Sequence, residues 1–243
     1  SRTDQAGFKL MSEPVFISCE RIESYAVIAI DRLAQTAITE LFHALTELQN
    51  DPEVRSIILT GAFSAGAELA DEQADKLASL LEGMGKPVIA AIDGEVSGGG
   101  CELALHCTWR IASASASFSF TPASREITTR LARMIGKARA LELILTGEPV
   151  GAAEALRYGL VERVVEDGVE LLRAARESAG QIGRNAPLAV KSALAAVKQA
   201  TELSLSEGMR LESSLFSFCC GTEDFREGVH AFLEKRDPVF KGE

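Results

Sequence analysis

The stretch of residues 87–105, PVIAAIDGEVSGGGCELAL, limits the possible folds more than any other part of the chain. Its apolar run at residues 88–92 predicts a buried strand, and the Asp-Gly pair at residues 93–94 predicts a turn. Three glycines at residues 98–100 then lead into a segment that predicts a helix and carries Glu102. Because glycine has no Cβ, a ligand can reach the bare backbone at this point.

This arrangement has two interpretations. The first turn of a helix has unpaired N–H groups and partial positive charge, which would stabilise an oxygen that gains negative charge in a reaction. Glu102 would then move a proton beside that oxygen. The alternative is structural, because glycine-rich turns often join a strand to a helix and a first-turn Glu often interacts with the helix dipole. The glycines alone favour the structural interpretation.

Composition narrows the class of protein. Of the 243 residues, 47% are hydrophobic and 25% are charged, as in ordinary globular chains. The net charge of −10 argues against a nucleic-acid partner, because phosphate binding needs basic clusters. No apolar run approaches the roughly 18 residues that span a bilayer, and no basic-then-apolar leader is found. The five cysteines lack metal-like spacing, so we expect reduced thiols, no membrane association and a cytoplasmic location.

Strands and helices alternate in the first part of the chain, and helices dominate the second. We predict an α/β core over residues 12–184 and a helical C-terminal part over residues 185–243. Predicted strands cover residues 15–19, 25–31, 56–60, 88–92, 109–112, 117–120 and 161–165. Predicted helices include an early one capped by Thr36 or Thr39, then residues 71–83, 128–135, 137–145, 151–158, 168–182, 187–201, 205–219 and 223–235. A loop is predicted to begin at Gly61.

Short motifs follow one another along nearly the whole chain. They are DPEVR at residues 51–55, IILTG at 57–61, FSAGAEL at 63–69, the stretch 87–105, GKARAL at 136–141, LTGE at 145–148, AEAL at 153–156, GLV at 159–161 and EDFREG at 223–228. Each motif is weak alone. Together, in this order, they are specific, and the chain resembles the crotonase superfamily, the enoyl-CoA hydratase/isomerase group.

The resemblance implies an α/β fold of crotonase type, a spiral of ββα units with a helical C-terminal part. It implies an acyl-CoA thioester as substrate with no further cofactor and no metal, and a homotrimer or dimer of trimers. The amides of Ala67 and Gly99 are implied to form an oxyanion hole for the thioester carbonyl, with each donor worth on the order of 3 kcal/mol. The implied substrate- or CoA-binding residues are Ala65, Glu68, Leu69 and Gly98.

Glu102 matches a carboxylate that the family's hydratases use as acid/base. Their second carboxylate usually stands in a Pro-Glu pair after a Phe-containing strand, but here Pro122 is followed by Ala123. Glu126 would substitute only if its loop bent inward, and a solvated surface position is the favoured interpretation. Several segments near the expected site are also shorter than the family pattern. Either these are real deletions, or residues of the natural protein are missing from this sequence.

The predicted activity is therefore reversible hydration of a 2-enoyl-CoA, with Glu102 as the catalytic residue. A double-bond isomerase that uses one carboxylate and a non-catalytic acyl-CoA binding homologue are the alternatives. His106 shares a helix face with Glu102, as an acid/base partner or half of a metal site, although a packed or capping histidine is favoured. By charge and by place in the motifs, the candidates for contact with the CoA phosphates are Lys137, Arg139, Lys235 and Arg236.

Overall fold

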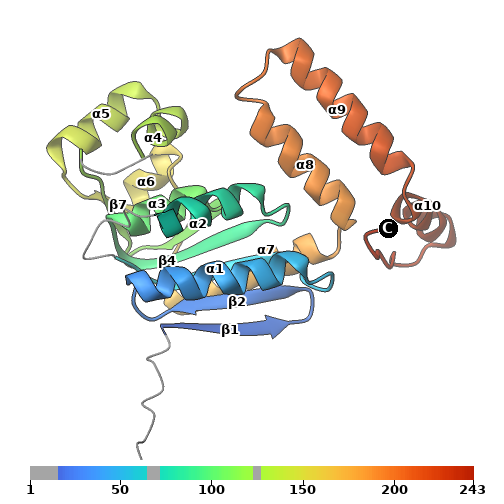
Figure 1. Cartoon of the computed structure of the whole chain (residues 1–243), viewed down its shortest axis with the longest axis horizontal. Helices are drawn as coiled ribbons and strands as arrows, with labels where there is room; N and C mark the ends of the chain where they lie inside the picture. The colour runs from blue at the N-terminus through green and yellow to red at the C-terminus, as the bar shows by residue number, and fades with distance from the viewer. Residues whose placement is uncertain (1–15, 65–71, 123–126) are drawn as a thin grey trace, which may run out of the picture.

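The computed structural model describes residues 16–64, 72–122 and 127–243, and its elements alternate between strands and helices before ending in helices (Figure 1). The strands are β1 (Ile17–Ile22), β2 (Tyr25–Ile30), β3 (Ser56–Ser64), β4 (Val88–Ser97), β5 (Trp109–Ser113), β6 (Ser117–Ser119), β7 (Val150–Gly151) and β8 (Arg163–Val165). The helices are α1 (Gln35–Asn50), α2 (Glu72–Gly83), α3 (Gly99–His106), α4 (Ile127–Ile135), α5 (Lys137–Thr146), α6 (Ala152–Tyr158), α7 (Gly168–Gly183), α8 (Pro187–Gln199), α9 (Leu205–Cys220) and α10 (Glu223–Glu234).

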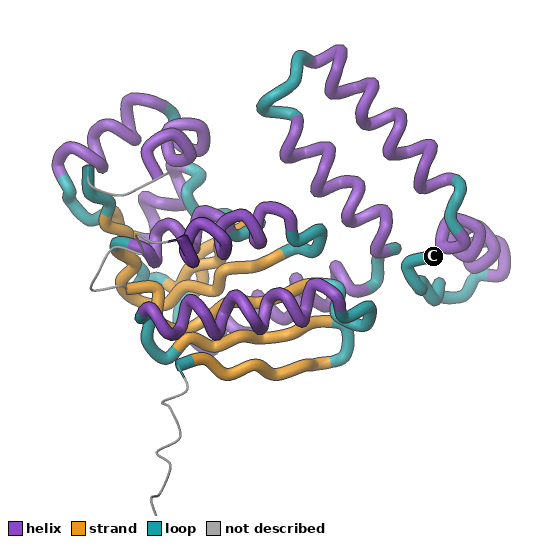
Figure 2. The backbone as a smooth tube through the Cα atoms, viewed as in Figure 1, coloured by secondary structure: helices purple, strands orange, loops and turns teal. Residues whose placement is uncertain are grey.

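The strands of the main sheet, drawn in orange in Figure 2, lie in the order β1-β2-β3-β4-β5-β8. β1 pairs with β2 in antiparallel fashion, while β2, β3, β4, β5 and β8 run parallel to one another. The short strands β6 and β7 form an offshoot, because β6 pairs with β4 and then with β7. Parallel neighbours bring their carboxyl ends to one edge of the sheet, and this edge is where ligands bind in open α/β folds.

β4 runs straight through the Asp-Gly pair, so the turn predicted at residues 93–94 is wrong. Ile92 and Val96 of β4 pair with Gly61 and Phe63 of β3. Three residues therefore separate the two pairs on β4 but only one on β3, so β4 forms a bulge here. β4 also changes neighbours here, from β5 before the bulge to β6 after it. Asp93 accepts hydrogen bonds from Ser113 Oγ (2.5 Å) and Ser115 Oγ (2.7 Å), which lowers the pKa of its carboxyl group. The Asp-Gly signal therefore marks a bulge where the sheet divides.

Two other local expectations are corrected. β3 continues past Gly61 to Ser64, so no loop begins at Gly61. α1 begins after Ala34, which makes no side-chain cap, rather than after Thr36 or Thr39. The helix is held instead by its apolar face, where Ile38, Leu41 and Leu45 are fully buried. Packing therefore decides where this helix lies, and capping contributes little.

Two apolar clusters flank the sheet. The larger joins the sheet to α1 through α6, and its fully buried members include Ile28, Leu41 and Leu59. The smaller lies under α7 and pairs Ile58 and Ile89 with three alanines of that helix. Because β3 contributes Leu59 to one cluster and Ile58 to the other, both of its faces are covered, as in other parallel sheets. The expected α/β architecture is confirmed, and the solved structures described below share it.

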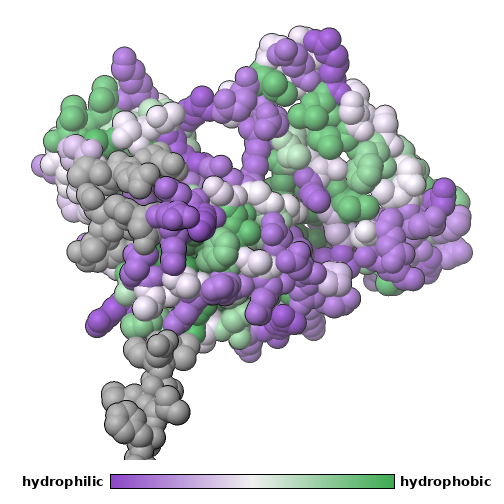
Figure 3. Space-filling view, in the orientation of Figure 1, coloured by the Kyte–Doolittle hydropathy of each residue, from purple (hydrophilic) through white to green (hydrophobic). Residues whose placement is uncertain are grey.

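α8, α9 and α10 extend away from the sheet as a helical appendix, drawn in orange to red in Figure 1. Among the described residues, none of α8 or α9 is buried. In Figure 3, green apolar patches lie on the surface over α8 and α9, with purple polar residues around them. The division of the chain at residues 184 and 185 stays a prediction, although it lies between the end of α7 and the start of α8.

Candidate active site

The carboxyl ends of β3 and β4 meet side by side. Ser64, the last residue of β3, pairs with Ser97, the last residue of β4, and their Oγ atoms lie 3.1 Å apart. The segment after Ser64 and the glycines after Ser97 therefore leave the sheet from one point. Of the predicted site residues, Ala65, Ala67, Glu68 and Leu69 lie outside the described residues, whereas Gly98, Gly99 and Glu102 lie within them.

Of the three glycines at residues 98–100, only the first lies outside the helix that follows. Gly98 alone precedes α3 as its N-cap residue, with φ 54° and ψ −131°, a conformation that favours glycine. Gly99 and Gly100 already belong to the first turn of the helix. A Cβ on Gly100 would stand 1.4 Å from the carbonyl oxygen of Phe63, so only glycine allows α3 to pack this closely on β3. The helix N-terminus is thereby fixed against the end of β3.

Glu102 occupies the first turn of α3 and is half-buried. It follows Gly99 by three residues, which places both on one face of the helix. No side chain caps this N-terminus within the described structure, and the first-turn amides face the same end of the helix as the Ser64–Ser97 pair. An amide donor and a carboxylate thus share the edge where the two strands end.

The buried thiol of Cys101 fastens α3 to the sheet. Its Sγ donates to the carbonyl oxygens of Val96 (3.4 Å) and Ser119 (3.2 Å), which belong to β4 and β6. Burial raises the pKa of the Cys101 thiol to about 12, and burial raises that of Cys107 to about 12 as well. Both thiols therefore stay protonated near neutral pH and serve in packing.

His106 closes the other end of α3. Its Nδ1 lies 2.7 Å from the carbonyl oxygen of Glu102, and its Nε2 lies 3.6 Å from Oε1 of Glu82. Glu82 in turn forms an ion pair with Arg130. These contacts fit the packed histidine that the sequence favoured. Among the residues that the structure describes, no group of three or more His, Cys, Asp or Glu side chains could hold a metal ion.

Sequence reasoning missed Arg110, which holds the C-terminal end of α3. Its side chain is 4% exposed and forms an ion pair with Glu162. The guanidinium donates to the carbonyl oxygens of Ala104 (3.4 Å), Cys107 (3.3 Å) and Leu160 (2.7 Å). A single Arg within the apolar run of β5 was the available signal, because a buried guanidinium requires several acceptors.

A family model supplies the deciding observation. The model described as enoyl-CoA hydratase/isomerase matches residues 29–243, which is most of the chain. The chain belongs to the enoyl-CoA hydratase/isomerase family. The resemblance inferred from the motifs is confirmed, and the chain is accordingly a member of an enzyme family.

Individual members of the family are similar over most of their length. A short-chain-enoyl-CoA hydratase from Clostridium acetobutylicum is 37% identical over 231 residues, covering 86% of this chain and 88% of that protein. A crotonyl-CoA hydratase from Syntrophomonas wolfei is 36% identical over 253 residues, covering 92% and 97%. The crystal structure of an enoyl-CoA hydratase from Bacillus anthracis superimposes with a TM-score of 0.83 at 34% identity, covering 94% of this chain and all of that one.

Two of the four candidate cations for the CoA phosphates, Arg139 and Arg236, have side-chain partners within the chain. The guanidinium of Arg139 stacks over the ring of Tyr158 at 4.6 Å from its centroid. Arg236 pairs with Glu227 (2.6 Å) and with Glu234 (2.7 Å). Glu126, for which a solvated surface position was favoured, lies outside the described residues together with Ala123. The roles of these residues and of the predicted catalytic set stay predictions.

Proposed function

We propose that this chain catalyses the reversible hydration of a short-chain 2-enoyl-CoA thioester. The proposal rests on one arrangement, in which the Gly99 amide and the Glu102 carboxyl group share the first turn of α3 at the paired ends of β3 and β4. The relatives named as short-chain-enoyl-CoA and crotonyl-CoA hydratases support this choice of substrate.

The chemistry needs one stabilised oxygen and one proton carrier. Water adds to Cβ of the enoyl group while the electron pair of the double bond moves to the thioester oxygen, which becomes an enolate. N–H donors from Gly99 and from the predicted partner Ala67 stabilise this oxygen. Glu102 accepts a proton from the attacking water and delivers one to Cα. Atoms and electrons balance without an oxidant or reductant, so we propose no cofactor beyond the CoA thioester itself.

The test is the conversion of crotonyl-CoA to the hydroxyacyl product in deuterated water. A Glu102→Gln variant should lower kcat by about 10² to 10⁴-fold while the Kd for a CoA thioester stays nearly unchanged, because only proton transfer is removed. Glu148→Gln is the matched control, because Glu148 is an exposed glutamate in the turn before β7. If Glu102→Gln retains full turnover, Glu102 has no part in the mechanism.

A second candidate is a double-bond isomerase, and the replacement of the usual Pro-Glu pair by Pro122-Ala123 favours it. One carboxylate is enough to remove a proton from one carbon and return it to another. In deuterated water an isomerase would move the double bond and exchange label without forming a hydroxyacyl product. Thioester binding with neither reaction would instead indicate a non-catalytic binding homologue.

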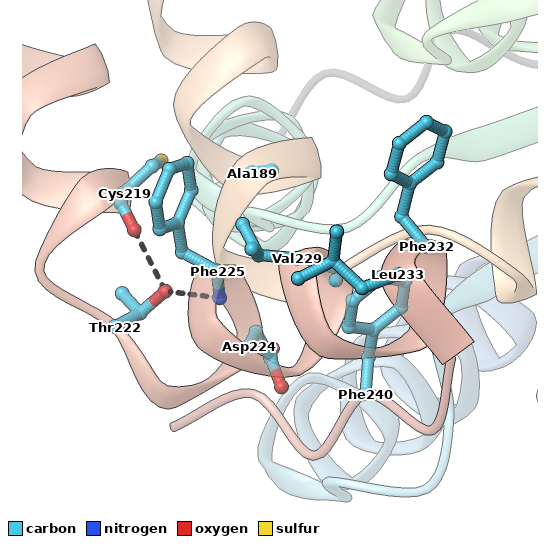
Figure 4. Close-up of a pocket in the computed structure, with 11 residues that line it drawn as sticks. Ala189, Cys219, Thr222, Asp224, Phe225, Val229, Phe232, Leu233 and Phe240 are labelled. Carbon is cyan, nitrogen blue, oxygen red and sulfur yellow. Dashed lines mark hydrogen bonds between the residues drawn. The ribbon is translucent and has the colours of Figure 1, made fainter. Parts of the chain in front are cut away.

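We further propose that the active form is a homotrimer, alone or stacked in pairs, held together by the appendix. An apolar groove of about 410 Å³ lies between α8, α9 and α10, where Phe225, Val229 and Leu233 line it (Figure 4). Phe232, which also lines the groove, is 82% exposed, and Phe216 on α9 is 67% exposed. Contiguous apolar surface of this kind marks a protein interface. A second copy of the chain is the proposed occupant.

A cytoplasmic location is also proposed. All five cysteines are free, including the buried pair on and beside α3, which suits a reducing compartment. No helix among the described residues has the length and apolar character needed to cross a membrane.

A further inference from the structure

A second cavity lies at the end of the sheet opposite the candidate active site. It has a volume of about 180 Å³, and its walls include Val54 and Arg55 just before β3 and Lys86 just before β4. Glu102 follows the far end of β4, which is a ten-residue strand. At about 3.3 Å per residue, the two sites stand on the order of 30 Å apart. The cavity is therefore separate from Glu102 and the first turn of α3.

The charge of this cavity is opposite to that of the chain. Its fifteen lining residues include four cations, Arg55, Lys86, Lys191 and Lys241, and no Asp or Glu is among these described residues. The whole chain has 35 acidic and 25 basic residues, so this concentration of positive charge is local. The nearby carboxylate of Asp51 already pairs with Arg21 at 2.8 Å. The cavity is thus positive without a carboxylate in its wall.

Two of the cations are held in place by carbonyl oxygens. Lys86 Nζ donates to the carbonyl oxygens of Leu48 and Asp51, at 2.6 Å each, which occupies two of its three N–H donors. Arg55 donates one N–H to the carbonyl oxygen of Phe240 at 3.2 Å. Burial lowers the pKa of Lys86, the Asp51 carboxylate opposes this shift, and repulsion from the Arg55 charge adds to it. An anion between the two cations would relieve this repulsion.

The other two cations come from the appendix and bring it against the core. The stem of Lys191 on α8 packs over Gly85, so that a Cβ added to this glycine would stand 3.4 Å from Cε of the lysine. Lys241 lies in the C-terminal tail, whose amides at Lys241 and Gly242 donate to the buried carboxylate of Asp224 at 2.7 and 2.9 Å. Gly242 also lies against Pro187 and Arg55. Core and appendix therefore each supply two cations to one cavity.

We propose that this cavity binds the phosphate group of a small phosphorylated metabolite or free phosphate. Four N–H-bearing cations on two sides of a small cavity suit the several charged oxygens of a phosphate, and the planar guanidinium of Arg55 matches two of them at once. A ligand that contacts both walls would tie the appendix to the core. The inference is independent of the hydratase activity, because it uses none of the residues of that site.

The test is thermal unfolding of the full chain at constant ionic strength with increasing inorganic phosphate, repeated with adenosine 5′-monophosphate and with uncharged adenosine. Saturating CoA is present throughout, so that phosphate cannot act through the acyl-CoA site. We expect a saturable rise in Tm with phosphate or the nucleotide and none with adenosine. A larger response to the nucleotide would indicate a phosphate ester as the natural ligand, and an equal response would indicate free phosphate.

Substitutions of lysines test whether phosphate binds in this cavity. The double substitution Lys191→Gln and Lys241→Gln should weaken phosphate binding at least tenfold, while Lys76→Gln on α2 should leave it unchanged, since Lys76 pairs with Glu72 outside the cavity. The Tm of each variant without phosphate checks that folding is intact. A non-saturable response, or equal weakening by Lys76→Gln, would overturn the proposal. If the double variant alters the fold, Lys241→Gln alone in the exposed tail must still reduce the affinity.

Discussion

The α/β core and the helical appendix differ in how far their apolar side chains are buried. In the core, Leu41 and Leu59 are fully buried between helices and sheet. In the appendix, large apolar side chains such as Leu205 and Phe232 stay more than 80% exposed. The two parts also differ in connection, because α8 and α9 contact each other extensively while α7 contacts the strands. The core therefore covers its own apolar side chains, whereas the appendix leaves large apolar side chains exposed.

This difference separates two kinds of sequence signal. Periodic apolar residues predict a core when a second element of the same chain covers them, and an interface when none does. α1 and α9 both carry such periodicity, yet five residues of α1 are buried while no described residue of α9 is. Substitution of apolar residues should therefore change the free energy of unfolding strongly in the core and weakly in the appendix.

The largest expected effect comes from Gly100→Ala. The new Cβ would stand 1.4 Å from the Phe63 carbonyl oxygen and 2.3 Å from its carbonyl carbon, so α3 and β3 must separate. We expect loss of at least about 4 kcal/mol in the free energy of unfolding, measured by urea denaturation, with failure to fold as the extreme result. Gly180→Ala is the control. A Cβ there meets no atom within 4 Å, and helix propensity predicts a gain of up to about 1 kcal/mol. Equal effects would disprove the close packing.

Truncation of apolar side chains tests the comparison directly. Leu41→Ala in the core should lower the free energy of unfolding by about 2 to 5 kcal/mol, because it removes buried methyl groups and leaves a cavity. Leu205→Ala at the start of α9 should change unfolding of the isolated chain by less than about 0.5 kcal/mol, because its side chain is 81% exposed. Similar losses in both variants would show that the appendix has a core of its own.

The interface interpretation is tested by polar substitution. Phe232→Ser combined with Leu233→Ser should convert the proposed trimer to monomers, as measured by light scattering after size exclusion, since both side chains lie at the apolar groove of Figure 4. Unfolding of the core should stay within about 0.5 kcal/mol of the parent value when both are measured at low protein concentration. Glu234→Ser is the exposed control on the same helix. Trimers that persist in the double variant would reject this surface as the contact.

The smallest effect concerns pH and the tail that follows α10. Hydrogen bonds from Arg236 and from the Val239 amide lower the pKa of Glu227 from 4.5 to about 2. Because the folded pKa is depressed, the stabilisation from this group is complete above pH 4.5 and is lost as the pH falls toward 2. The Tm of the parent should therefore fall more between pH 6 and pH 3 than that of Glu227→Gln. Added salt should shrink the difference, because the pair is exposed.

The sequence predicted most of the fold, since strand and helix periodicity depends on local pattern and strong burial. The helix over residues 137–145 and the strand over residues 109–112 appear in the structure as α5 and β5. The Asp-Gly pair was misread, because a turn and a bulge have the same local preference and only the neighbouring strands decide between them. Arg110 was missed for a related reason, since its acceptors at Ala104, Cys107 and Leu160 are defined by the folded chain.

The candidate site also has features that the sequence predicted and features that depend on the folded chain. Gly98 and Glu102 could be placed at the start of a helix from sequence because a strand, glycines and a helix follow one another directly. The sequence could not show that the segment after Ser64 starts beside these residues. This position depends on the pairing of β3 with β4 across more than thirty residues of chain. The family motifs supplied this long-range information indirectly.

The change of neighbours along β4 has a mechanical consequence. Its first half pairs with β3 and β5 inside the sheet, whereas its second half pairs with the end of β3 and with the three-residue strand β6. The bulge at Asp93 separates this first half from a short second half that ends at Ser97, two residues before Gly99. Substitutions around β6 are therefore expected to shift Ser97 and the start of α3 while the first half of β4 keeps its pairing with β3 and β5.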